Sequence, residues 1–114
     1  MSAEQIEFDD FQKVDMRTGT VVDVKPNPKA RKPAFVLTID FGDALGQRTS
    51  SAQLTENYDV QSLIGKQIVA VVNFPPMRIA GVKSEVLVLG AMTDQHGVVL
   101  LEPTFGVPNG TAIG

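Results

Sequence analysis

Residues 14–25 read VDMRTGTVVDVK, and this stretch decides the fold. Val, Met and Thr side chains take every second position from Val14 to Val24, while the positions between them are mostly polar or glycine. An alternation of period two over this length predicts a long strand whose buried face carries Val14 and Val24. Gly19 in the middle of the strand predicts a bulge or a sharp bend, which a strand needs in order to curl into a barrel.

The remaining chain carries shorter strands separated by turns. Residues 35–41 alternate in the same way, and a turn at 42–46 leads into a polar strand at 47–53, so the pair predicts a hairpin. Further strands are predicted at 66–73, 86–91 and 98–101, the last two separated by a turn at 93–97, with helical turns at 9–12 and 55–64. We expect Phe8 and Phe11 to pin the first helical turn against the body of the domain. Five to six strands with short helical turns predict one all-β barrel domain over residues 1–114.

Two of these strands are apolar at every position. They are Ile68–Val72 and Val86–Leu89, and a strand needs such a sequence only when both of its faces are covered. One core covers one face, so a local helix, the C-terminal tail or a second subunit must cover the other. We favour a second subunit packed by two-fold symmetry.

The composition is that of an ordinary globular domain, with 43% hydrophobic and 20% charged residues. The absence of Cys excludes disulfides and thiolate chemistry and is compatible with a reducing compartment. A net charge of −3 argues against tight general binding of nucleic acid. The acidic N-terminus has no apolar core, and no apolar run approaches the length of a membrane span, so we expect a cytoplasmic protein with no membrane insertion.

Nothing in the sequence predicts catalysis, and we expect neither an enzyme nor a cofactor. The single histidine, His96, lies in a predicted turn and is interpreted as a solvated loop residue. With one His and no Cys, and with acidic residues that lack calcium-loop spacing, no metal site is expected. Gly81–Ser84 resembles the end of a phosphate-binding loop but lacks the first glycine of that motif, since position 76 is Pro76.

Two stretches are candidates for binding a partner. Residues 48–53 form a strand of small polar side chains, and residues 73–85 combine an aromatic residue, a methionine, a rigid turn and two cations. The alternative for the second stretch is a long surface loop with Phe74 and Ile79 tucked into the core. The candidate peptide-binding residues are Ser50, Ser51, Phe74, Pro76, Met77, Arg78, Ile79, Lys83 and Ser84.

A second candidate site is the basic cluster formed by Lys25, Lys29, Arg31 and Lys32. It lies in a proline-stiffened segment that could equally be an ordinary solvated loop, and it would suit the steering of phosphates. Together with the two cations of the second stretch, the candidate tRNA-binding residues are Lys25, Lys29, Arg31, Lys32, Arg78 and Lys83.

Several motifs resemble a known family. Residues 14–21, 63–73 and 81–85 are similar to the tRNA-binding OB domain found at the C-terminus of many methionyl-tRNA synthetases and in EMAP-II-type cytokines. Further motifs resemble the CsaA group within that family: Ser50–Gln53, Asn73–Pro76, Ser84–Gly90 and Pro108–Thr111. The resemblance implies an OB-fold with a C-terminal extension in a homodimer interface, and an export-related chaperone that receives extended peptide segments in a cleft near that interface.

The sequence departs from the tRNA-binding relatives in one loop. Met77 and Ala80 stand where those relatives usually have Lys or Arg. Fewer cations there, and the acidic total, favour a dimeric chaperone for unfolded or presecretory segments. The alternative is a tRNA-binding accessory module with weak tRNA binding.

Overall fold

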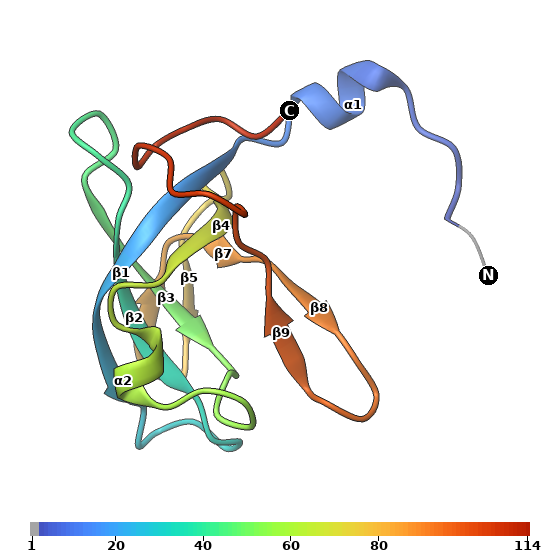
Figure 1. The fold of residues 1–114 in the computed structure, drawn as a ribbon. Coiled ribbons are helices and arrows are strands. Elements are labelled where there is room, and N and C mark those ends of the chain that lie inside the picture. Colours follow the sequence, from blue (N-terminus) through green and yellow to red (C-terminus); the bar gives the residue numbers. More distant parts are fainter. Residues whose placement is uncertain (1–2) are drawn as a thin grey trace.

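The computed structural model describes residues 3–114, and Figure 1 shows how its strands and two short helices are arranged. In chain order the elements are α1 (Phe8–Gln12), β1 (Met16–Pro26), β2 (Phe35–Asp40), β3 (Gln47–Ala52), α2 (Val60–Leu63), β4 (Gln67–Val71), β5 (Met77–Ile79), β6 (Val82–Ser84), β7 (Leu87–Val88), β8 (Gly90–Met92) and β9 (Val98–Leu100).

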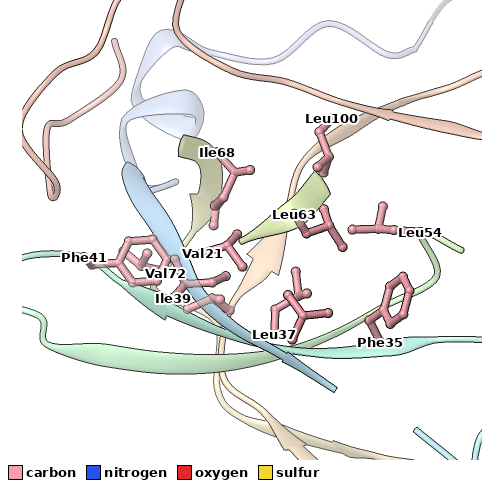
Figure 2. Packing of buried hydrophobic residues seen from close by; sticks show 13 residues of the cluster. Val21, Phe35, Leu37, Ile39, Phe41, Leu54, Leu63, Ile68, Val72 and Leu100 are labelled. Atoms are coloured by element: carbon pink, nitrogen blue, oxygen red, sulfur yellow. The ribbon is translucent and has the colours of Figure 1, made fainter. Parts of the chain in front are cut away.

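The main sheet has five strands in the order β3-β2-β1-β4-β7 and curls into a nearly closed barrel (Figure 1). Alternate side chains of β2 point into it, as its period-two sequence predicts, and the fully buried members include Leu37 and Ile39. Figure 2 shows these side chains converging with Leu63 of α2 and with Leu100 of β9. The predicted all-β barrel of OB type is therefore confirmed.

The bulge in β1 lies at a different residue from the predicted one. The register with β2 shifts between Val21 and Asp23, so Val21 and Val24 both point into the core while Val22 is 40% exposed. The prediction of one continuous face from Val14 to Val24 is therefore wrong, because the bulge exchanges the faces at Val22. Gly19 has another role: a Cβ there would lie 2.7–2.8 Å from Ile39 and the Phe41 ring, so glycine permits a close approach.

The C-terminal segment pairs with the first residues of β1, where Arg17 and Ala112 form an antiparallel bridge (Figure 1). Thr18 donates its backbone N–H to the Thr111 carbonyl at 3.0 Å, and Gly110 donates to the Thr18 carbonyl at 2.8 Å. The Arg17 guanidinium bonds Asp15 at 2.7 Å and the Gly110 carbonyl at 3.1 Å. The hydrogen bond to Asp15 and the negative charge of Asp15 raise the pKa of Arg17.

This segment corrects the expectation that a second subunit covers β4. Gln67, Val69 and Val71 share the outer face of β4, and the Gln67 side chain donates to the Val107 carbonyl of the tail at 2.7 Å. Val69 and Val71 are 8% and 5% exposed within a single chain. The outer face of β4 is therefore covered within a single chain, with the tail bonded to Gln67, whereas Leu87 in β7 is 49% exposed.

The predicted strand at 86–91 divides into two strands of different sheets. β7 pairs with β4 in the barrel, and β8 pairs with β9 in a ribbon that projects from it (Figure 1). The predicted turn at 93–97 is confirmed, since Thr93 donates its N–H to the Gly97 carbonyl at 3.0 Å.

The helices are short. Glu7 and Asp10, rather than Asp9, form the capping box of α1, and no residue of that helix is buried. Phe8 and Phe11 are 69% and 36% exposed, and their rings contact each other with centroids 6.2 Å apart. The expectation that both side chains pin α1 to the body is therefore wrong. In residues 3–114 no helix is both long and apolar enough to cross a membrane.

Candidate functional site

An apolar groove lies on one side of the barrel, with a volume of about 360 Å³. Four large apolar side chains around it are exposed to solvent: Phe74 (53%), Met77 (65%), Ile79 (42%) and Leu87 (49%). Such a concentration of exposed apolar side chains marks a surface suited to binding. The residues that line the groove are Phe74, Pro75, Met77, Ile79, Ser84, Glu85, Val86 and Leu87.

One wall of the groove is a β-hairpin formed by β5 and β6. No strand was predicted within residues 74–85, so this hairpin was not expected from the sequence. β5 and β6 pair in the register Met77–Ser84, Arg78–Lys83 and Ile79–Val82. The two turn residues, Ala80 and Gly81, have φ angles of 48° and 82°, as a type I′ turn requires. This turn matches the twist of paired strands, so it holds Met77 and Ile79 at fixed positions beside the groove.

Two polar residues of the groove lining are occupied in closing the barrel. The Ser84 hydroxyl accepts the Ser51 N–H at 3.1 Å, and the Glu85 carboxylate accepts the Thr49 N–H at 3.1 Å. Glu85 also donates its own N–H to the Thr49 carbonyl at 2.8 Å. Side chains of Ser84 and Glu85 therefore supply part of the hydrogen bonding along the edge of β3. These bonds fix the position of the groove wall relative to the barrel.

The two serines of β3, both predicted as peptide-binding residues, do not line the groove. Ser50 is 1% exposed and pairs with the buried Leu37, so its side chain points into the barrel and away from any ligand. Ser51 is half-buried and contributes its N–H to barrel closure. Ser50 is therefore corrected from a binding residue to an interior one.

The predicted apolar residues and the predicted cations lie on opposite faces of the hairpin. Met77 and Ile79 share one face because they are two positions apart, and the cross-strand pair Arg78–Lys83 occupies the other. Pro76 is exposed beside the groove but is not among its lining residues. Arg78 and Lys83 therefore face away from the groove side of the hairpin, and their part in peptide binding stays a prediction.

Part of the basic cluster, Lys25 and Lys29, lies beside the tip of the hairpin. Lys25 and Lys29 line a smaller cavity of about 260 Å³ together with the hairpin tip at 80–82. The Arg78 guanidinium donates to the Gly81 carbonyl at 3.3 Å, and the Lys29 ammonium lies 3.5 Å from where a Cβ of Gly81 would be. Arg31 and Lys32 are exposed in the adjoining loop and line neither cavity.

Sequence reasoning missed half of the groove lining, namely Pro75, Glu85, Val86 and Leu87. The usable signal was the all-apolar segment 86–89, whose outer face had no partner in the barrel. His96 is exposed in its turn, and the described residues contain no group of three potential metal ligands among His, Cys, Asp and Glu.

Comparison with known proteins gives a family. Residues 16–112 match the profile described as "Putative tRNA binding domain". The methionine–tRNA ligases of Porphyromonas gingivalis and Parabacteroides distasonis are each 34% identical over 111 and 110 residues, 97% and 96% of this chain. The chain spans about one sixth of each ligase, 16% of its length.

The chain also matches solved structures over their full length. The chaperone CsaA of Bacillus anthracis is 53% identical with a TM-score of 0.92, and 97% of this chain matches 100% of that one. The CsaA chaperone of Picrophilus torridus is 51% identical with a TM-score of 0.91, over 96% of this chain and 100% of that one. The methionyl-tRNA-synthetase-related protein of Pyrococcus horikoshii is 28% identical with a TM-score of 0.86, over 98% and 100%. The chain belongs to the tRNA-binding domain family, and within that family to the CsaA group.

Proposed function

We propose that this chain is a dimeric, export-related chaperone of the cytoplasm. It holds extended apolar segments of unfolded or presecretory polypeptides in the apolar groove and performs no reaction of its own. The observation that carries the proposal is the set of four solvent-exposed apolar side chains around one groove on a rigid barrel. Two structural neighbours over 50% identical across their full length bear the name chaperone, which supports it.

Release of the bound segment follows from mass action. A protein that binds unfolded chains shifts their folding equilibrium in proportion to its free concentration and its affinity. The groove is open and apolar, so bound segments gain mostly from removal of apolar surface from water.

A second candidate function is tRNA binding, and the basic face of the hairpin favours it. Lys25 and Lys29 lie beside the tip of the hairpin, and Arg78 and Lys83 pair across its two strands. The family match at residues 16–112 supports the same alternative. Salt dependence separates the two functions.

Fluorescence anisotropy with an uncharged unfolded peptide and with tRNA, measured in parallel, tests the proposal. Peptide affinity is expected to change less than about twofold between 50 and 200 mM salt, since burial of apolar surface releases no counterions. Binding of tRNA through about four phosphates is expected to fall on the order of 100-fold over the same range. Tight tRNA binding at physiological salt without any peptide binding would contradict the chaperone proposal.

The dimer has support from a separate set of exposed apolar residues. Phe8 and Phe105 are 69% and 82% exposed, and neither of them lines the groove. Burial of such side chains against a second copy would remove them from water. Sedimentation equilibrium is expected to give twice the 12.2 kDa of one chain. A mass of one chain at every concentration would disprove the dimer.

A further inference from the structure

One edge of β5 has no partner strand. β5 pairs with β6 in a two-stranded sheet, and within residues 3–114 no strand pairs with its other side. All three of its residues are exposed. An open strand edge presents N–H and C=O groups that can pair with an added chain.

The register identifies which backbone groups face this open edge. A two-residue turn makes Ile79–Val82 a hydrogen-bonded pair, so the next pair, Arg78–Lys83, is a non-bonded one. The N–H and C=O of Arg78 therefore point away from β6 and toward the open edge. They offer an incoming strand one donor and one acceptor beside the apolar groove.

The two faces of the hairpin would contact different side chains of the added strand. Residues of an added strand alternate between the Met77 and Ile79 side, where the groove lies, and the Arg78 side. The groove side offers apolar contact. The other side offers the cations Arg78 and Lys83, and among the described residues neither has a carboxylate within ion-pair distance.

We propose that the preferred ligand is an extended segment in which large apolar side chains alternate with acidic ones, added as a strand at β5. The proposal rests on the function proposed above, because it names the class of segment that the apolar groove selects. The apolar residues enter the groove, the acidic residues lie next to Arg78 on the face that also carries Lys83, and the Arg78 backbone supplies the strand hydrogen bonds. Opposite charges placed side by side on neighbouring strands stabilise their pairing.

Three short fluorescent peptides test the proposal by anisotropy at 50 mM salt with the intact chain. The first alternates Leu with Glu, the second alternates Leu with Lys, and the third has the composition of the first with its Leu and Glu residues in separate blocks. The alternating acidic peptide is expected to bind about tenfold more tightly than either of the others. Methylation of its backbone nitrogens on the strand-pairing side is expected to remove most of that advantage.

Charge reversal gives the matched control. The double variant Arg78→Glu with Lys83→Glu is expected to prefer the alternating basic peptide, and its thermal melt shows whether the hairpin still folds. Equal binding of all three peptides, or no effect of backbone methylation, would overturn the strand-addition proposal while leaving the chaperone function in place. If none of the three peptides binds, and the uncharged unfolded peptide does not bind either, both the strand-addition proposal and the chaperone function would be overturned.

Discussion

Replacing Phe74 and Met77 together by alanine is expected to weaken the binding of an unfolded peptide about 30- to 150-fold. Both side chains are more than half exposed in the free chain and would lose that exposure under a bound segment. Their truncation removes about 2–3 kcal/mol of apolar burial from the complex. Anisotropy with the uncharged unfolded peptide measures the effect.

The chain provides a matched control for this experiment. Met92 is 88% exposed and lies outside the groove lining, so Met92→Ala removes a similar side chain from another surface. It is expected to leave peptide binding unchanged. Because none of the three side chains is buried, all the variants should melt close to the parent temperature. Loss of binding in Met92→Ala, with binding retained in the double variant, would place the peptide elsewhere.

Replacing Gly110 by alanine is expected to lower the free energy of unfolding by about 3 kcal/mol. Gly110 has a φ of 87°, which costs an L-residue roughly 1–2 kcal/mol. A Cβ at this position would also lie 2.5 Å from the Phe41 carbonyl oxygen, a backbone atom that cannot move aside without shifting the strand. The tail would therefore lift from β1 and uncover the outer face of the barrel.

Two other glycines separate the cost of the positive φ from the cost of the contact with Phe41. Gly65 has the same φ of 87° but no atom within 4 Å of a Cβ, so Gly65→Ala is expected to cost only about 1 kcal/mol. Gly106 lies in the same tail with neither constraint, and Gly106→Ala is expected to have almost no effect. Urea unfolding at one fixed protein concentration measures all three. If Gly110→Ala unfolds like Gly106→Ala, the tail is not docked on β1 in the way described.

The barrel could be predicted because hydrophobic alternation carries the information. In β2 the large residues Phe35, Leu37 and Ile39 contrast with the residues between them, so the inward face is visible in the sequence. In β3 the side chains are all small or polar, and no such contrast exists. Ser50 points inward because it pairs with Leu37 in the register of β2 and β3. The register is the alignment of two strands, and the sequence of one strand alone does not encode it.

The groove was harder to predict than the barrel. Its hairpin turns through Ala80–Gly81, whereas the dipeptides that usually indicate this turn are Asn-Gly and Asp-Gly. The same turn puts Met77 and Arg78 on opposite faces, which a reading of residues 73–85 as a loop could not show. The tail contacts join residues about 90 positions apart, such as Thr18 with Pro108, so no local pattern indicates that the chain covers its own β4.

Methionine-methyl NMR tests the central claim, that the apolar groove binds the unfolded segment, most directly. With ¹³C-methyl methionine in the intact chain, Met77 reports on the groove and the still more exposed Met92 reports on a different surface. Titration with the uncharged unfolded peptide is expected to shift or broaden the Met77 methyl signal and to leave the Met92 signal unmoved. A titration that moves Met92 while Met77 keeps its free position would contradict the account.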